Sequence, residues 1–508
     1  MAGLSAPGVR WTILAALAAG ICACTAGPDY VRPAAPANAE FKELKDWQPA
    51  RPAESVDRGR WWSIYGDAEL DALESQVAID NQTLKASEAA YRQAVALVLQ
   101  ARAGYFPTVS AGPGYSNRQT VSTATVVSST GVPLGAGIST NNSTYSMQGT
   151  ASWVPDFWGQ VRRQVESDVA AAQASAAQLA LARLTAQAQL ATAYFELRYQ
   201  DSLQQLLNET VAALRRSLQI TENQYAVGVV ARGDVITART QLQTTLAQST
   251  AVGIQRGQFE HAIALLIGKP PSALSIPAVP LTRTVPVIPV GLPSTLLERR
   301  PDIAQAERTM QQENALVGVQ TAAYYPTITL SASLTYLGSS VAALESTSTR
   351  LWTLAASGSE LAIDGGQRSA AVAGARAAYD ESVANYRQTV LTAFQSVEDA
   401  LVSLRILERQ ADDEASAVEL AGLAVQIALN EYRAGTQPYT AVVTAQQIAL
   451  ADEQTALQIQ ESRLVASVAL VQALGGGWDA SQLPASSAIN KGSTSPAAEA
   501  ITKGNTKP

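Results

Sequence analysis

The chain has few of the residues that metal sites, disulfides and acid–base catalysis use. Its 508 residues include two cysteines, one histidine and three methionines. Both cysteines lie at or before residue 24, so nothing beyond that point can form a disulfide. His261 lies on an apolar helical segment, and we find no nucleophile elbow, metal-ligand cluster or phosphate-binding loop. These absences argue against an enzyme and against a bound metal or cofactor.

Charge and long apolar runs are also scarce. Charged residues make up 16% of the chain and the formal net charge is −7, so no basic excess is available for nucleic-acid phosphates. We therefore exclude nucleic acid as a partner. Apart from a short stretch near the N-terminus, no run approaches the roughly 20 apolar residues of a membrane-spanning helix. If this protein crosses a membrane, it does so with β-strands.

The N-terminal stretch has the features of a secretory signal followed by a lipid-attachment site. Ile21-Cys22-Ala23-Cys24 resembles a bacterial lipobox, in which a small residue precedes the modified cysteine. Cys24 fits this pattern and Cys22 does not. We expect residues 1–23 to be removed and Cys24 to carry S-diacylglycerol and N-palmitoyl groups, which would anchor the segment 24–66 in outer-membrane lipid. Cleavage elsewhere, with two unused cysteines, is the alternative.

The rest of the chain repeats one pattern. Residues 103–110 recur as 322–329, and residues 223–228 recur as 430–435. The first copy contains about a dozen more residues between these landmarks than the second. We place them in a turn-rich loop within the Ser/Thr/Gly-rich segment Asn117–Thr144.

These copies define the domain organisation. The first repeat covers residues 67–276 and the second covers 295–478. A proline-studded connector, residues 277–294, separates them. After Trp478 the chain is rich in Ser, Ala, Pro and Lys, and we predict that residues 479–508 are disordered.

Each repeat contains a predicted β-hairpin, at residues 105–154 and 325–363. The strand-forming runs alternate partially and approach the 9 to 11 residues of a tilted transmembrane strand. Ordinary soluble hairpins are the alternative, because the alternation is weak in any one segment. Four strands cannot close a barrel in hydrocarbon, so strands that span a bilayer must be pooled between chains, and three chains supply twelve.

Long helices follow each hairpin. Apolar residues spaced alternately by three and four mark coiled-coil seams, for example Tyr386, Val390 and Ala393. No proline interrupts residues 160–225 or 367–432, which predicts two helices of about 65 residues, each about 100 Å long. The sequence therefore predicts an α+β membrane protein with a long coiled-coil rod.

Each long helix ends at a Tyr-x-x-Gly sequence. The glycines, Gly228 and Gly435, suit the left-handed conformation that closes a helix and lets the chain reverse. We predict a helical hairpin with its tip near residues 225–234 in the first repeat and 432–444 in the second. A plain helix cap, with no further role, is the alternative for both glycines.

Five short motifs carry a resemblance to a known family. In chain order they are Gly27-Pro28-Asp29-Tyr30-Val31-Arg32-Pro33, Trp61-Trp62 with 67–73, Asp156-Phe157-Trp158-Gly159, Leu297-Glu298-Arg299-Arg300-Pro301-Asp302-Ile303 and Leu474-Gly475-Gly476-Gly477-Trp478. With these motifs, residues 20 to 478 resemble the TolC-like outer membrane factors. The similarity is greatest to the lipoprotein branch of multidrug efflux channels.

The resemblance implies a fold and a function. It implies a homotrimer with a twelve-stranded β-barrel in the Gram-negative outer membrane and an α-helical barrel in the periplasm. Such a protein is the exit duct of a tripartite efflux pump and conducts small molecules passively. A duct for type I protein or polymer secretion is the alternative, and a purely structural coiled-coil lipoprotein is the third.

Two protein partners are implied in addition. A periplasmic adaptor would dock on the hairpin tips, where we expect Tyr225, Gly228, Tyr432 and Gly435 to contribute. An inner-membrane pump, of the resistance-nodulation-division type, would supply the energy. Outer-membrane lipid would surround the strands.

The family also implies a gate at the hairpin tips. Its members use an aspartate at the position of Asp234, a tyrosine at Tyr432, an arginine at Gln437 and acidic residues at Ala441 or Thr444. Only the aspartate and the tyrosine are retained here. The ion-pair clamp of the relatives therefore cannot form in the same way.

We expect a gate that depends more on packing than on ion pairs. Arg232 and Arg433 are possible substitute partners for the missing charges. The alternative for Asp234 is that its side chain caps the helix that follows.

Overall fold

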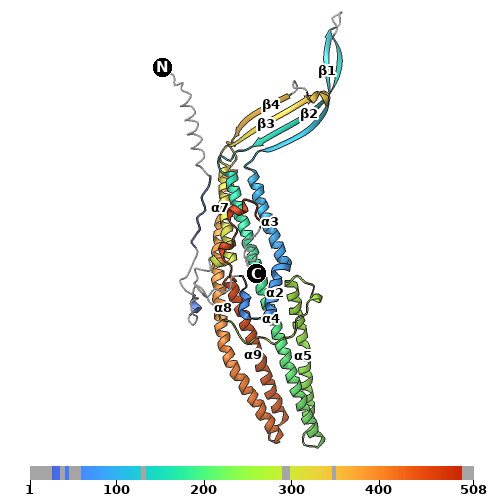
Figure 1. The fold of residues 1–508 in the computed structure, drawn as a ribbon, viewed down its shortest axis with the longest axis vertical. Helices are drawn as coiled ribbons and strands as arrows, with labels where there is room; N and C mark the ends of the chain where they lie inside the picture. Colours follow the sequence, from blue (N-terminus) through green and yellow to red (C-terminus); the bar gives the residue numbers. More distant parts are fainter. Residues whose placement is uncertain are drawn as a thin grey trace, which may run out of the picture.

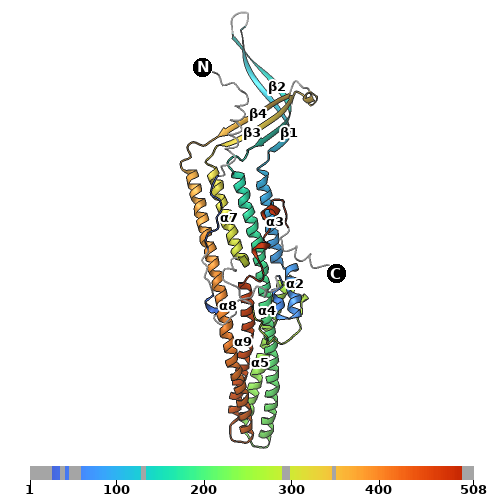
Figure 2. The ribbon, with the colours of Figure 1, turned by 60° about the vertical axis from the view of Figure 1, so that its left-hand side comes forward.

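The computed structural model describes residues 26–34, 41–44, 59–127, 133–288, 298–345 and 350–494. These residues form an elongated molecule with a β-sheet at one end and two helical hairpins at the other (Figures 1 and 2). The predicted signal peptide and Cys24 lie outside the described residues.

The helices occur in pairs of equal length. The pairs are α3 (Gln82–Ala103) and α7 (Pro301–Ala322) with 22 residues, α4 (Gln160–Ala226) and α8 (Gln367–Arg433) with 67, and α5 (Arg232–Leu266) and α9 (Tyr439–Ala473) with 35. The shorter α2 (Ala68–Asp80) precedes α3. The prediction of two long uninterrupted helices is therefore confirmed.

Helix α4 is the central element of the helical region. It packs against α3, α5, α7 and α9, and α8 packs against α7 and α9. Small residues such as Ala172, Ala177 and Ala191 are fully buried along α4, so neighbouring helices can approach it closely. The seam predicted on α8 is also buried, with Tyr386, Val390 and Ala393 inaccessible to solvent.

The described strands form one antiparallel sheet in chain order. It consists of β1 (Thr108–Val127), β2 (Pro133–Trp153), β3 (Thr327–Gly338) and β4 (Arg350–Ser359). The outer strands, β1 and β4, each leave one edge unpaired within the protomer.

The predicted loop over Asn117–Thr144 is wrong. The β1–β2 ladder continues through this segment until Val127 pairs with Pro133. The additional residues of the first repeat therefore lengthen two strands. Ser, Thr and Gly are common in turns, but a paired partner strand satisfies their backbone groups equally well, so composition alone misplaced the turn.

The motif that begins at Gly27 fastens the N-terminal segment to the helices. The Ala26 amide donates to the carbonyl of Trp158, and the guanidinium of Arg163 on α4 binds the carbonyls of Ala26 and Gly27 and the Asp29 carboxylate. Gly27 has φ +87°, and a Cβ there would lie 2.3 Å from the Cα of Gly318 on α7. A side chain cannot fit at this position.

Further along this motif, Arg32 reaches α7 and α8. Its guanidinium pairs with Glu307 at 3.2 Å and donates to the Tyr386 hydroxyl at 3.4 Å. Residues 26–32 therefore bridge three helices close to the base of the sheet.

The proline-rich connector is held by a buried ion network, in its described part up to residue 288. Asp201 on α4 accepts from Arg198 at 3.2 Å, from Arg256 at 2.7 Å and from the Val279 amide at 3.1 Å. Arg198 also donates to the Pro277 carbonyl at 2.6 Å. These contacts replace the backbone pairing that a proline-rich segment cannot make.

The predicted disorder of residues 479–508 is wrong for residues 479–494. These form a short 3-10 helix, Ala480–Gln482, and one turn of helix, α10 (Ser486–Ile489). Ile489 is fully buried beside Tyr91 and Val98 of α3, and Gln173 of α4 donates to the Pro484 carbonyl. Leu483 packs against the same cluster, and the Tyr91 hydroxyl donates to the Ser493 carbonyl, so contacts with α3 and α4 order this polar segment. Residues 495–508 lie outside the described part of the chain.

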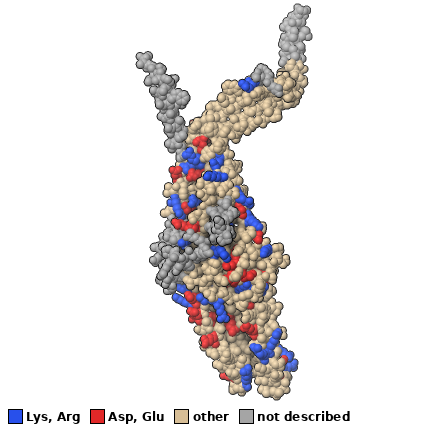
Figure 3. Space-filling view, viewed as in Figure 1, with Lys and Arg blue, Asp and Glu red and all other residues tan. Residues whose placement is uncertain are grey.

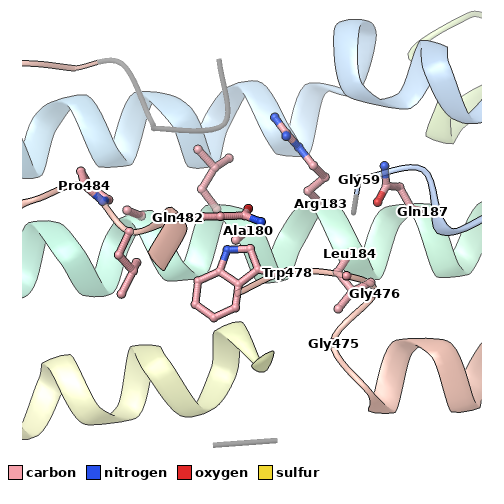
Figure 4. Close-up of a pocket in the computed structure, with 14 residues that line it drawn as sticks. Gly59, Ala180, Arg183, Leu184, Gln187, Gly475, Gly476, Trp478, Gln482 and Pro484 are labelled. Atoms are coloured by element: carbon pink, nitrogen blue, oxygen red, sulfur yellow. The ribbon is translucent and has the colours of Figure 1, made fainter. Parts of the chain in front are cut away.

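The triple-glycine motif begins this C-terminal segment. A Cβ on Gly475 would lie 2.0 Å from the Arg299 carbonyl oxygen, and one on Gly476 would lie 2.2 Å from the Leu184 side chain. A cavity of about 120 Å³ lies beside this turn, and Trp478 and Arg183 are among the residues that line it (Figure 4). The glycines therefore allow the chain to pass between α4 and the segment before α7.

Glu74 is an unusual buried acid on α2. It is fully inaccessible on the same helix as the buried Leu70 and Val77, and neither carboxylate oxygen has a hydrogen-bond partner among the described residues. Burial, with a smaller contribution from the nearby Asp71 carboxylate, raises the pKa of Glu74 to about 9. The folded protein therefore keeps this carboxyl protonated at neutral pH.

We predict that Asp201→Ala lowers the free energy of unfolding by about 3 to 5 kcal/mol, because it leaves the buried Arg198 without its partner. Denaturant unfolding of the detergent-solubilised protein measures this change. Asp412→Ala, at an exposed position on α8, is the matched control and should have little effect. Equal effects of the two substitutions would contradict a structural role for the network.

We also predict that Glu74 makes the protein less stable as pH rises. The unfolded chain releases this proton near the ordinary pKa of 4.5 and the folded protein near 9, so the free energy of unfolding falls between these values. Glu74→Gln should remove most of that fall, and Glu69→Gln, exposed on the same helix, should not. Unfolding curves at pH 5, 7 and 9 test this; an unchanged slope in Glu74→Gln rules it out.

Candidate functional site

The sheet has one apolar face. Paired residues on neighbouring strands point to the same side, so each cross-strand row can be read from the register. One row consists of Val109, Ala151, Ala332 and Leu354, and another consists of Ala111, Gly149, Leu334 and Trp352. Leu354 and Trp352 are 73% and 67% exposed in the protomer, so this surface has no cover from the chain itself.

The opposite face carries hydroxyl groups. The row between those two consists of Ser110, Thr150, Ser333 and Thr353, and the Ser110 and Thr150 hydroxyls are 2.7 Å apart. Over their full length the four strands contain two charged residues, Arg118 and Arg350. The sheet is nearly free of charge in Figure 3, in contrast to the helices.

Aromatic residues lie where the sheet meets the helices. Trp158 stacks on Tyr325 with ring centroids 4.9 Å apart and donates to the Pro326 carbonyl at 2.7 Å. Trp153 donates to the Tyr105 carbonyl at 3.1 Å. Tryptophan and tyrosine are enriched at membrane–water interfaces, where one end of the ring system is apolar and the other is hydrated.

No described helix has both the length and the apolar content required to span a bilayer. Likewise, the described His, Cys, Asp and Glu side chains form no group of three that could hold a metal ion. His261 is exposed on α5.

The two hairpin tips share one backbone geometry. Gly228 and Gly435 have φ values of +78° and +76°, as predicted for left-handed helix caps. In each tip the glycine amide donates to the carbonyl of the tyrosine three residues earlier, Tyr225 or Tyr432, at 3.0 Å. The next amide donates five residues back, which completes a Schellman motif at both ends.

The two tyrosines have opposite environments. Tyr225 is 47% exposed, whereas Tyr432 is 7% exposed. The sequence repeat alone predicts equivalent roles for them. The structure separates these roles, because Tyr432 packs against residues of α4 and α5.

Tyr432 belongs to a packed cluster that joins the two hairpins. Its ring lies 5.2 Å from that of Tyr439, whose hydroxyl is 3.0 Å from the Ser217 hydroxyl on α4. Val442 of α9 and Ala238 of α5 complete the buried core. Burial raises the pKa of Tyr432, and the nearby Asp234 carboxylate raises it further.

The other predicted gate residues lie around this cluster. Asp234 is in the first turn of α5, but the residue at the N-cap is Ala231, so the alternative that Asp234 caps the helix is wrong. Gln437, Thr444, Arg232 and Arg433 are exposed. Neither arginine forms an ion pair with another described residue of the same protomer.

Sequence reasoning missed Tyr439. It is 1% exposed, immediately after Pro438, and occupies the position that Arg232 has in the first repeat. The alignment of the two repeats places Tyr439 opposite Arg232, and this difference was the signal in the sequence that the two tips are not equivalent.

Comparison with known proteins places the chain in a family. The family model described as outer membrane efflux protein matches residues 73–269 and 292–476. The pyoverdine export outer membrane protein OpmQ of Pseudomonas aeruginosa is 30% identical over 469 residues, which cover 92% of this chain and 96% of OpmQ. The cation efflux system protein CusC of Escherichia coli is 26% identical over 472 residues, which cover 91% of this chain and 97% of CusC.

Solved structures agree with this placement. The outer-membrane channel OprN superposes with a TM-score of 0.81 at 29% identity, covering 90% of this chain and all of OprN. The CmeC channel of Campylobacter jejuni shares the fold, with a TM-score of 0.82 at 21% identity over 93% of this chain and 99% of CmeC. The chain therefore belongs to the outer membrane efflux protein family and is an outer-membrane component of an efflux system.

Proposed function

We propose that three copies of this chain close a twelve-stranded β-barrel and form the exit duct of a tripartite efflux pump. The observation that carries the proposal is the two-faced sheet with unpaired edges at β1 and β4. In hydrocarbon the backbone groups of those edges need partners, and a neighbouring copy supplies them. The apolar face then meets lipid and the hydroxyl face lines a hydrated channel.

The lipid anchor proposed at Cys24 fits this arrangement. Cys24 is two residues from Ala26, whose amide binds Trp158 at the base of the sheet. Two residues span at most about 7 Å, so an anchor on Cys24 would be held within that distance of Ala26 and close to these aromatic residues. The N-terminal motif thus supports attachment of the anchor and barrel to the same bilayer surface.

The proposed cargo is small molecules without a common chemistry. Relatives have names that refer to pyoverdine, toluene and cations. The described channel-facing rows carry hydroxyl groups and no cluster of charges, which gives little basis for selecting one solute. A periplasmic adaptor on the hairpin tips and an inner-membrane transporter of the resistance-nodulation-division type would provide selection and energy.

The proposed gate is the cluster around Tyr432 and Tyr439. It holds the two hairpins of one protomer together at the end farthest from the sheet (Figure 1). Opening requires the hairpins to separate, and this would expose the two buried rings. Apolar packing of this cluster, rather than ion pairs within the protomer, would therefore keep the gate closed.

We predict that loss of this gene sensitises cells several-fold to a set of chemically unrelated toxic compounds. Growth inhibition by antibiotics, dyes, detergents and metal salts, with wild-type rescue, measures this. Cys24→Ser should rescue less well if the anchor contributes to assembly, and Cys22→Ser is its matched control. No sensitisation after other ducts of the cell are removed would favour protein or polymer secretion.

We predict that Tyr432→Ala raises the conductance of the closed state. Removal of a buried aromatic ring weakens packing by about 3 to 5 kcal/mol, which allows the hairpins to part. Single-channel recording of the purified protein in planar bilayers tests this, with the exposed Tyr225→Ala as control. Asp234→Ala tests the carboxylate separately, since an unchanged closed state removes Asp234 from the gate.

A further inference from the structure

The cavity beside the triple-glycine turn is formed mainly by two parts of the chain. Residues 176–187 of α4 form one wall and residues 475–484 form the other (Figure 4). Its volume is about 120 Å³. A single water needs about 10 to 15 Å³, and an apolar cavity of about 150 Å³ in another protein binds benzene. This cavity therefore has room for a molecule of about six non-hydrogen atoms.

Polar side chains line part of the cavity. Arg183 and Gln187 lie one turn apart on α4 and project to the same side of that helix in Figure 4. Gln187 is 6% exposed, and its side-chain amide forms no hydrogen bond with another described residue. Gln482, from the opposite wall, also has no side-chain partner in the described part of the chain. Both amides are therefore available to a ligand.

The charge of Arg183 has no counter-charge among the described residues. Its Nε atom is inaccessible to solvent and has no hydrogen-bond partner there, and its guanidinium forms no ion pair with them. Burial lowers the pKa of Arg183 more than the Glu88 carboxylate on α3 raises it. No acidic residue is among the described residues that line the cavity. Because a buried, unpaired cation is costly, the site favours an anion.

The rest of the lining selects among anions. It is mostly apolar and includes the Trp478 ring and four aliphatic side chains, Leu179, Leu184, Leu483 and Pro484. Sulfate or phosphate would leave these groups without an apolar partner. A carboxylate with a short apolar body contacts both parts of the lining, and its two oxygens match the planar fork of a guanidinium.

We propose that this cavity binds a short-chain carboxylate, with its charged end toward Arg183 and its carbon atoms against Trp478. The amides of Gln187 and Gln482 donate to the same oxygens. Because the contacts come from both walls, the bound anion joins α4 to the C-terminal segment 479–494. The described walls belong to one protomer, so the site requires no contact between copies and no other protein.

Binding is tested with trifluoroacetate, which is small enough for the cavity and is observed by fluorine NMR. Its line should broaden in the presence of the purified full-length protein in detergent, beyond the broadening that detergent alone produces. Trifluoroacetamide has the same shape without the charge and should bind at least about ten-fold more weakly. Equal binding of the two probes, or binding of neither, would overturn the proposal.

Competition defines the class of anion. Propionate should displace trifluoroacetate, and sulfate at the same concentration should displace far less. Sulfate that competes as well as propionate would assign the cavity to inorganic anions and would refute the assignment to a carboxylate.

Substitutions locate the site. Arg183→Gln should weaken binding of trifluoroacetate at least about ten-fold, and Arg183→Lys should restore part of the affinity, because an ammonium keeps the charge but not the fork. Arg215→Gln, at an exposed arginine on the same helix, is the matched control and should change binding little. An Arg183→Gln protein that binds as tightly as the wild type contradicts the inference.

Two further measurements exclude a folding defect as the cause. Gln482→Ala, on the C-terminal segment and outside the long helices, should weaken binding several-fold while leaving the unfolding midpoint without ligand unchanged. Propionate should raise the unfolding midpoint of the wild type and not that of Arg183→Gln, since only a folded site that binds the ligand is stabilised by it. An equal rise in both proteins would place the bound carboxylate elsewhere and reject this site.

Discussion

The unpaired edges of β1 and β4 impose the strongest constraint on this molecule. A four-stranded sheet with one apolar face can enter hydrocarbon only if every backbone donor and acceptor has a partner, and the described strands leave one edge of β1 and one edge of β4 unpaired. Association of copies around an axis resolves this. In the assembly we propose, the hydroxyl rows face inward, and the helices that continue from the strands form the walls of a continuous passage.

The proposed ring requires the long helices of each protomer to hold fixed positions, and the connecting segments make contacts that tie these helices together. The N-terminal motif ties α4, α7 and α8 together near the sheet, and the Asp201 network ties the connector to α4 and α5 further down. The C-terminal segment joins α3 to α4 through Ile489. Segments without long regular elements thus connect the long helices to one another, in addition to the small-residue contacts between the helices themselves.

The sequence predicted correctly those features that depend only on residues close together in the chain. Absence of proline and regular apolar spacing gave the long helices, and left-handed glycines gave their ends, because both depend on neighbours within a few turns. Sequence-based prediction failed for features that depend on contacts with residues far away in the chain. The β1–β2 extension depends on the opposite strand, the order of residues 479–494 depends on the α3–α4 surface, and the burial of Tyr432 depends on α4 and α5. Sequence similarity between repeats also concealed the difference between Tyr225 and Tyr432, because each side chain meets different helices.

The equal helix lengths have an evolutionary consequence. One residue inserted into α4 alone would lower its tip by about 1.5 Å and rotate every exposed side chain there by about 100°. The tips would then no longer end in one plane, and the Tyr432 cluster would lose its register. No such penalty applies to β1 and β2, which exceed β3 and β4 in length and project past them. Insertions and deletions in related chains should therefore accumulate at the outer end of the strands, while the helices change length only in both repeats together.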